Sequence, residues 1–357
     1  MAGGHDSPST TLAQESEEGA ATASGSDVLS DVLRAVRLTG AQFFLVDGSS
    51  PWVAEVPEAS LVAPAILPGA QHLISYHLLT SGRCWAGAAG ESALWLEAGD
   101  VLVVPHGDLY TLATSPVTVG EQPLEAVLQF FRDLGAGRLS WTLQEGGGGP
   151  ERVSVICGFL ACDIVPFNPV LSMLPRLLRV RPPASGQDRL GSLVEFALEE
   201  SRQQRAGSDC VRLRISELMF VEVVRRYLAS LPPEQKGWLA GLRDPAVGRA
   251  ITLLHRRMAE PWTLESLARE VGASRSALAE RFAHFLGQPP MQYLARWRMQ
   301  MAARLLADGP AKVSAVALEV GYESEAAFSR AFKKMAGTSP ATWRNKPAPF
   351  GSRQRNI

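Results

Sequence analysis

The chain has few cysteines and none at the spacing of a metal or redox motif. Its four thiols, Cys84, Cys157, Cys162 and Cys210, form no CxxC pair. A zinc module or a small disulfide scaffold needs closely spaced cysteine pairs, so the pattern argues against both. We therefore expect reduced thiols, a cytoplasmic location, no bound cofactor and no structural metal.

Long apolar runs are also missing. No stretch of 18 or more apolar residues occurs, so we predict no membrane span and no membrane partner. The first residues show neither the basic nor the apolar region of a secretory signal. Residues 1–27 have no Lys or Arg and almost no large apolar side chain, which predicts a disordered tail. Residues 346–357 are expected to form a second tail.

Charge is unevenly distributed along the 357 residues, although the net charge is only −1. From Asp244 to Ile357 there are 17 Lys and Arg against 9 Asp and Glu, a net of +8, and the rest carries −9. A basic region beside an acidic one predicts that the basic region binds a polyanion such as nucleic acid. An arginine-rich, solvated helical surface is the simpler alternative.

The basic region contains one short pattern twice, in residues 267–282 and 316–332. In each copy a small residue stands four positions before a glycine, and two apolar residues four apart follow it. These residues are Ala268, Gly272, Leu278 and Phe282, then Ala317, Gly321, Phe328 and Phe332. The small residue lets two helices cross closely, the glycine permits a positive φ, and the apolar pair buries the second helix. The repeat predicts two helix-turn-helix units, whose second helices enter the DNA major groove.

The rest of the chain divides by its periodicity. Short apolar runs between Gly, Pro and Asp clusters, such as 41–46 and 100–104, predict that 28–187 is mainly strands in a sandwich or barrel. Helices are expected over 190–204 and 211–231, and the wide apolar arc of the second is typical of core or of an oligomer interface. We interpret 188–237 as a helical dimerisation segment and linker. An all-helical domain, 238–345, follows.

Start and stop signals within 238–345 place its helices. Pro245 begins the first one, and Thr263 and Ser274 are expected to cap the helices of the first unit. A long helix over 291–307 joins the two units. Trp262, Trp297 and Trp343 are interpreted as packing residues and not as base readers.

The residue pattern of 238–345 is specific along its length. It comprises Leu267-Ala268, Gly272-Ala273-Ser274, Leu278, Arg281-Phe282, Gly287-Gln288-Pro289-Pro290, Trp297-Arg298, Leu305-Leu306, Val320-Gly321-Tyr322, Phe328-Ser329-Arg330, Phe332-Lys333, Ser339-Pro340 and Trp343-Arg344. With these residues the segment resembles the DNA-binding domain of the AraC/XylS family of transcription regulators. The resemblance covers both helix-turn-helix units and the helix between them.

Residues 28–187 resemble, less specifically, the cupin-type ligand domain of one subgroup of that family. The resemblance is carried by His77-Leu78-Leu79, Gly82-Arg83-Cys84-Trp85, the run Leu96 to Asp108, Cys157-Gly158, Asn168-Pro169-Val170 and Leu174-Pro175. It implies a multidomain α+β protein. The N-terminal part would be a cupin-like β-barrel with two following helices, and the C-terminal part an all-α domain with two helix-turn-helix units.

The resemblance implies a sequence-specific transcription regulator, expected to be an activator, and not an enzyme. Its partners would be double-stranded DNA, RNA polymerase, a small-molecule effector of unknown identity and a second copy of the chain. A cupin-type enzyme or metal-binding protein with an appended DNA-binding module is the alternative. A scaffold whose barrel only dimerises is a third possibility.

The recognition helices of such proteins present their exposed N-terminal positions to base edges. The base-reading candidates are Arg275, Ser276, Ala279, Glu280, Glu325, Ala326, Ser329 and Arg330. Arg275 and Arg330 have the donors to bind guanine or phosphate, and Glu280 has the acceptors for cytosine N4. Family members often carry a basic residue where this chain has Glu280, which leaves open how much affinity the first unit contributes. Phosphate contacts are expected from Arg296, Arg298, Lys333, Lys334 and Arg344.

A metal-dependent cupin enzyme would need several converging ligands, and the candidates are His72, His77, His106 and Asp108. The usual first cupin motif has two His one residue apart, whereas His72 and His77 are five apart. The usual second motif ends in His, where this chain has Tyr110. We therefore predict no metal site and favour a sensor that holds a small ligand inside the barrel. The pocket candidates are His77, Trp85, Trp95, His106 and Tyr110.

Overall fold

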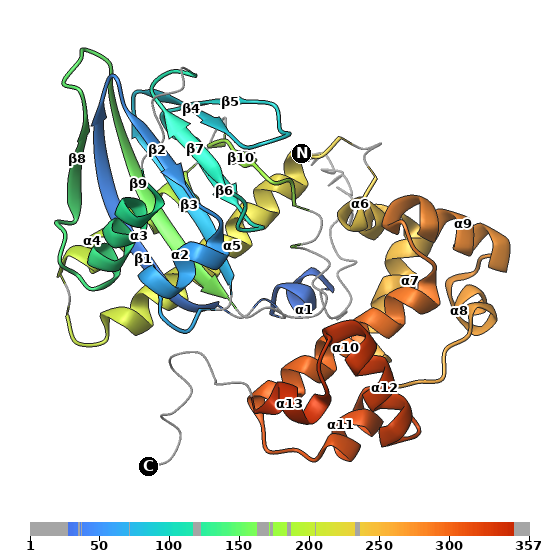
Figure 1. Cartoon of the computed structure of the whole chain (residues 1–357). Coiled ribbons are helices and arrows are strands. Elements are labelled where there is room, and N and C mark those ends of the chain that lie inside the picture. Colours follow the sequence, from blue (N-terminus) through green and yellow to red (C-terminus); the bar gives the residue numbers. More distant parts are fainter. Residues whose placement is uncertain are drawn as a thin grey trace, which may run out of the picture.

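A computed structural model describes residues 28–345, except 35, 37, 71, 117–122, 163–170, 172–173, 184–186, 204 and 233–235. The predicted tails 1–27 and 346–357 and the motif Asn168-Pro169-Val170 lie outside the described residues. A β-rich N-terminal part and an all-helical C-terminal part lie side by side (Figure 1). In the described ranges, no helix has the length and apolar character needed to cross a membrane.

The β-rich part consists of two facing sheets. Its strands are β1 (Leu38–Ser49), β2 (Val53–Val56), β3 (His72–Ser81), β4 (Arg83–Gly87), β5 (Leu94–Glu97), β6 (Val101–Val104), β7 (Tyr110–Ala113), β8 (Thr142–Gly146), β9 (Arg152–Cys162) and β10 (Leu178–Val180). The larger sheet has the order β10-β6-β3-β9-β1-β8 and the smaller one β2-β7-β4-β5. The predicted strands at 41–46 and 100–104 are confirmed as parts of β1 and β6.

The cupin-like fold class is confirmed, but the two sheets stay open where a closed barrel was expected. Strand β8 ends the larger sheet and β2 ends the smaller one, and the described strands show no pairing between them. Helix α3 (Leu124–Gly135) lies at this open edge, where Phe131 meets Phe159 of β9 edge to face at 5.5 Å. Side chains of α3 line the cavity at this edge, together with residues of both edge strands.

Three helices of the N-terminal part were not predicted from the sequence. They are α1 (Val28–Arg34), and α2 (Ala59–Ile66) and α3, which pack against each other beside the sheets. The expectation that 28–187 is mainly strands overlooked the spacing of Val127, Phe130, Phe131 and Leu134. This i, i+3, i+4, i+7 pattern is that of an amphipathic helix with one apolar face.

The larger sheet is buried on both faces because successive side chains along each strand point to opposite sides. In β3, Ile74 and Tyr76 belong to a core shared with the helices, and Leu73 and Leu79 face the interior between the two sheets. The interior is therefore enclosed by the inner faces of both sheets.

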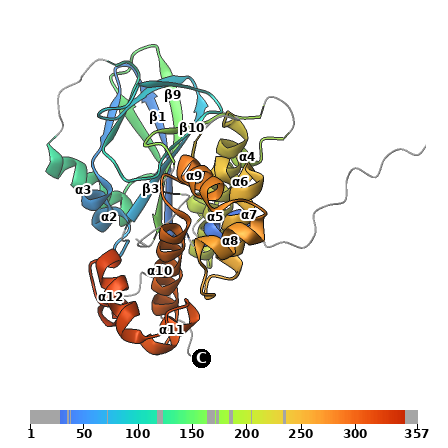
Figure 2. The ribbon, with the colours of Figure 1, turned by 90° about the vertical axis from the view of Figure 1, so that its right-hand side faces the viewer.

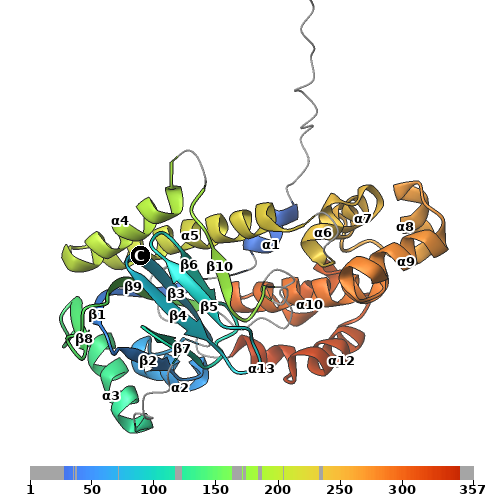
Figure 3. The ribbon, with the colours of Figure 1, turned by 90° about the horizontal axis from the view of Figure 1, so that it is seen from above.

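Helices α4 (Arg189–Gln203) and α5 (Ser208–Ser230) confirm the two predicted helices and cover the outer face of the larger sheet (Figure 3). Most of the wide apolar arc of α5 is core, since Met219 and Val223 are fully buried. On these two helices, two large apolar side chains stay exposed, Phe196 of α4 by 53% and Leu218 of α5 by 56%.

The C-terminal part is all-helical, as predicted. It comprises α6 (Trp238–Arg243), α7 (Pro245–Arg256), α8 (Leu264–Val271), α9 (Arg275–Leu286), α10 (Pro290–Asp308), α11 (Val313–Glu319), α12 (Glu325–Ala336) and α13 (Pro340–Arg344). Helix α10 connects the group α6–α9 to the group α11–α13 (Figure 2). Asp244 caps α7 by accepting from the amides of Ala246 and Val247, which confirms the predicted start at Pro245.

The two parts share one hydrophobic core. It runs from the outer face of the larger sheet through α4, α5 and α1 (Val28–Arg34) into α7, α8 and α9. Helix α1 packs on α7, and Nη2 of Arg243 donates to the Leu228 carbonyl at the end of α5, at 2.7 Å. These contacts would therefore transmit a displacement of α5 to α6 and α7.

Candidate functional site

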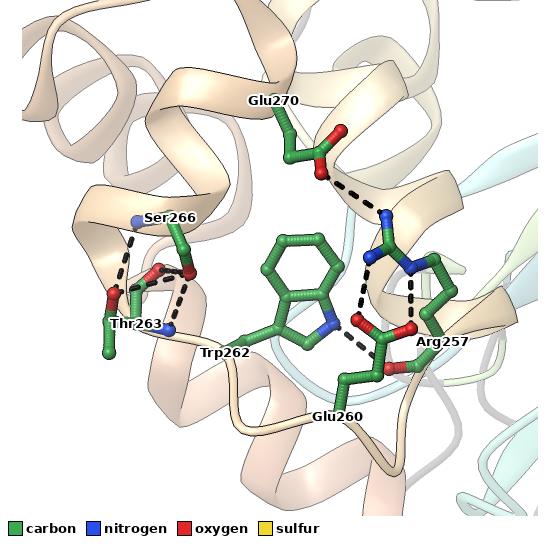
Figure 4. Close-up of polar contacts among 6 residues, drawn as sticks. All are labelled: Arg257, Glu260, Trp262, Thr263, Ser266 and Glu270. Carbon is green, nitrogen blue, oxygen red and sulfur yellow. Dashed lines mark hydrogen bonds and ion pairs between the residues drawn. The ribbon is translucent and has the colours of Figure 1, made fainter.

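The first helix-turn-helix unit, α8 and α9, forms as the repeat predicts. Thr263 and Ser266 cap α8, each backbone amide donating to the other hydroxyl at 3.0 Å (Figure 4). The helix ends at Gly272, whose φ of +72° is one that L side chains rarely adopt. The Ser274 hydroxyl then caps α9 by accepting from the Ala277 amide at 3.1 Å. Local sequence therefore specifies this turn.

The second unit, α11 and α12, repeats the arrangement. Its turn contains Gly321 at a φ of +83°, and the Ser324 hydroxyl accepts from the Ala327 amide at 3.2 Å. Phe328 and Phe332 have no exposed surface, and neither have their counterparts in α9. Both predicted apolar pairs are therefore core residues that hold a recognition helix on its partner.

The two units meet at a contact around Arg298 of α10, which we call the inter-unit joint. The guanidinium donates from Nε to the Met258 carbonyl and from Nη2 to the Glu260 carbonyl, each at 2.7 Å. Gly321 packs on the same turn, since a Cβ added to it would lie 2.6 Å from the Ala259 carbonyl oxygen. The joint thus connects the turn before the first unit to the turn inside the second.

A second set of contacts shapes the turn before α8 (Figure 4). The Arg257 guanidinium pairs with Glu260 at 2.6 Å and with Glu270 at 3.3 Å, and it lies 4.8 Å from the ring centre of Trp262. The indole Nε1 of Trp262 donates to the Arg257 carbonyl at 2.9 Å, so this residue packs as predicted. Exposed ion pairs of this kind contribute little energy, so their effect is mainly to fix the path of the chain.

The predicted base-reading positions lie at the N-terminal ends of α9 and α12. Ala279 and Ser329 are half-buried, and the others are exposed. Within the described residues, no hydrogen bond or ion pair engages the guanidinium groups of Arg275 and Arg330. Both groups are therefore available to a ligand.

The predicted phosphate contacts separate into two kinds. Lys333 and Lys334 are exposed in the last turn of α12, and Arg296 is exposed on α10. Arg298 and Arg344 are half-buried, and each donates to a backbone carbonyl within the domain. The geometry favours a positioning role for these two, because their hydrogen-bonding capacity is directed inward.

A buried aromatic hub connects α6, the first helix after the predicted linker, to the joining helix α10. The Tyr293 hydroxyl accepts from Trp238 Nε1 and hydrogen-bonds His255 Nε2, each at 2.7 Å. The His255 ring stacks on Trp297 with centroids 3.9 Å apart. Burial lowers the pKa of His255 to about 3, so the ring is neutral at pH 7. The hub therefore attaches α6 to the C-terminal helical part.

A cavity of about 150 Å³ lies at the open edge of the two sheets. Side chains of β1, β2, β3, β7, β8, β9 and α3 line it. Most of its wall is apolar and aromatic, with Trp52, Phe130 and Phe131 among the lining residues. A half-open, mostly apolar space with few polar groups is typical of a small-molecule site.

His77 is the predicted pocket residue that lines this cavity. Its Nε2 hydrogen-bonds the Tyr110 hydroxyl at 2.6 Å, and its Nδ1 lies 3.2 Å from Cys157 Sγ. Burial lowers the pKa of His77 to about 3 and raises that of the Cys157 thiol well above its ordinary value. This polar group is therefore uncharged at pH 7, and both imidazole nitrogens already have partners.

The other predicted pocket residues lie outside the cavity lining. Tyr110 is buried behind His77, and the Trp85 ring lies over Gly87 on the smaller sheet. Trp95 is 44% exposed with Arg83 over its ring, and His106 Nε2 hydrogen-bonds the Leu174 carbonyl at 2.8 Å. Their assignment to an effector pocket stays a prediction.

Of the metal-ligand candidates, His72 and Asp108 each bind another part of the protein. His72 Nε2 hydrogen-bonds the Pro105 carbonyl, and Asp108 pairs with Arg176, both at 2.8 Å. His77 lies apart from them in the interior. In the described part of the chain, no three His, Cys, Asp or Glu side chains gather in a way that would hold a metal ion.

Sequence reasoning missed most of the cavity wall, including Trp52, Glu55, Phe130, Phe131 and Glu145. The amphipathic spacing in 127–134 was a usable signal for the two phenylalanines. Nothing in the sequence near Glu55 or Glu145 indicates a binding site, because acidic residues at exposed strand positions are common.

Comparisons with known proteins agree with both parts of the structure. A cupin family model matches residues 27–229, and a helix-turn-helix domain model matches residues 267–346. A putative AraC-like transcription regulator of Streptomyces lividans is 32% identical over 81% of this chain and 93% of its own length.

Two further relatives have more specific names. The HTH-type transcriptional regulator AlkR of Acinetobacter baylyi is 26% identical over 90% of this chain and 99% of its own length. The RCS-specific HTH-type transcriptional activator RclR of Escherichia coli is 29% identical over 55% of this chain and 69% of its own length.

Proposed function

The chain belongs to the AraC family of transcription regulators, with a helix-turn-helix domain that binds DNA, and we propose that it activates transcription in response to a small molecule. The observation that carries the proposal is a ligand-sized cavity on the inner face of the larger sheet, whose outer face shares one hydrophobic core with α4, α5 and the first recognition helix, α9. Effector binding at the open edge would shift α4 and α5 against the sheet, and the shift would reach α6 and α7.

The DNA-binding half is proposed to read two successive major-groove faces, about one helical turn apart. Arg275 and Arg330 support this reading, because both guanidinium groups are exposed and unengaged within the described residues. Lys333 and Lys334 would contact phosphate and raise affinity without sequence choice.

The remaining partners follow from this role. An activator contacts RNA polymerase, and several relatives of this chain carry the name activator. We propose that the chain acts in the cytoplasm, where bacterial DNA lies, and that it catalyses no reaction. In support of the last point, its relatives are named as transcription regulators.

Dimerisation through 190–231 stays a proposal. Phe196 on α4 and Leu218 on α5 support it, because both are large apolar side chains exposed by more than half. Leu218→Lys should convert a dimer to a monomer in sedimentation velocity at micromolar concentration. Leu124→Lys, at a similarly exposed position on α3, is the matched control. A monomeric wild-type protein would contradict the proposal.

DNA recognition is tested by selecting binding sites from random-sequence DNA with the full chain. The selected DNA is then titrated at two salt concentrations with competitor DNA present. Competitor-resistant binding over a short footprint with two half-sites supports the proposal. Binding that shows no sequence choice and disappears with salt contradicts it.

A further inference from the structure

The cavity at the open edge has the size of a one-ring molecule. Its volume is about 150 Å³. An apolar cavity of about 150 Å³ engineered in another protein binds benzene. The part of an occupant that enters the cavity is therefore limited to a single ring or a short chain with one small substituent.

The charges that face the cavity all have one sign. Among the described residues, its charged lining consists of two carboxylates, Glu55 on β2 and Glu145 on β8, with no Lys or Arg. His77 and Cys157, the polar groups of the interior wall, are neutral at pH 7. A negatively charged ligand would be repelled there, and a positively charged one attracted.

Glu145 lacks a compensating charge. No ion pair or hydrogen bond engages its carboxylate within the described residues, and burial raises its pKa. The residue itself is exposed, so its carboxylate is only partly desolvated, and a ligand cation in the cavity would supply the charge that it lacks. The ion pair would lie beside aromatic rings of the same wall, which include Phe130 and Phe131 and also attract cations.

We propose that the effector is a small organic amine with one ring or a short apolar chain, its ammonium group bound at Glu145 and its apolar part packed against Phe131 and Phe159. This inference rests on the proposed function, because it assigns a ligand class to the sensing cavity. Glu55 lies on the opposite edge strand and supplies a second negative charge at the cavity wall.

The test uses three probes of one shape, 2-phenylethylamine, 2-phenylethanol and phenylacetate, in calorimetric titrations of the full chain at pH 7. The amine should bind about tenfold tighter than the alcohol, as expected for one charge-assisted hydrogen bond, and phenylacetate more weakly than the alcohol. Tighter binding of phenylacetate, equal binding of all three, or binding of none would overturn the proposal.

Variants then locate the charge. Glu145→Gln keeps the shape of the side chain and should reduce affinity for the amine about tenfold while leaving the alcohol unchanged. Glu151→Gln, an exposed position outside the lining, is the control and should change neither. If Glu145→Gln does not fold, Glu55→Gln should still weaken the amine selectively. Amine binding that is indifferent to the folded variants would overturn the assignment.

The same preparation is tested for binding to its selected DNA site. Sequence-specific DNA binding together with failure of the amine would refute the ligand class and leave the regulator intact. Loss of both would count against the proposed function itself.

Discussion

Replacing Arg298 with alanine tests whether the inter-unit joint sets the relative position of the two recognition helices. A phosphate contact, the role first expected for Arg298, would leave the protein fold unaffected by the change. A positioning residue would not, because its guanidinium donates to the carbonyls of Met258 and Glu260 at 2.7 Å each. The two roles therefore predict different measurements.

The cost of Arg298→Ala can be estimated from these contacts. Hydrogen bonds from a charged donor contribute about 1.5–3 kcal/mol each. The half-buried guanidinium also pays for desolvation, which lowers its pKa, and that cost disappears in the variant. We expect a net loss of about 2–3 kcal/mol in the free energy of unfolding. A domain of ordinary stability, about 5–15 kcal/mol, would still fold.

The functional readout is the preferred spacing of the two half-sites. One inserted base pair rotates the second half-site by about 35°, since a helical turn takes about 10–10.5 base pairs. Wild-type affinity should fall steeply with such an insertion, whereas Arg298→Ala should bind the original site more weakly and discriminate less between spacings. Its salt dependence should stay unchanged.

Lys333→Ala is the matched control, because Lys333 is exposed at the end of α12. It should lower the slope of log affinity against log salt by about one and leave the spacing preference and the stability unchanged. If Arg298→Ala shows that same behaviour, with native stability, the joint has no positioning role and the residue contacts phosphate.

Three further predictions follow from the structure. Arg330→Ala should weaken binding to the selected site by about 1–3 kcal/mol, with loss of choice at one base pair and no change in unfolding free energy; equal weakening on all sequences would make it a phosphate contact. Tyr293→Phe should lower the free energy of unfolding by about 1–3 kcal/mol, because Trp238 Nε1 and His255 Nε2 lose their shared partner; an unchanged urea midpoint would contradict this. Lowering the pH from 7 to 5 should reduce stability, because the pKa values of His77 and His255 are lowered to about 3. Between about 6.5 and 3 the unfolded chain binds protons that the folded chain does not, so a pH-independent urea midpoint would refute this.

Local sequence predicted the helical half of the fold well. Caps, turn glycines and apolar pairs act over a few residues, so their positions in the sequence nearly determine α8, α9, α11 and α12. The strand regions were recognised by the same means, but α1, α2 and α3 were missed. The open edge was missed too, because strand pairing depends on contacts between distant segments.

What the sequence determined by itself is therefore the pair of helix-turn-helix units, whose turns and helix contacts are encoded within about sixteen residues each. Only the tertiary structure decided which of the charged residues stay exposed and which face inward. Arg298 faces inward to bind two carbonyls that lie 40 and 38 positions earlier in the chain, so the local sequence could not predict its orientation. The cavity likewise exists only after folding brings Glu55, Phe131 and Glu145 from separate elements to one edge, since no short-range pattern records a meeting over such distances.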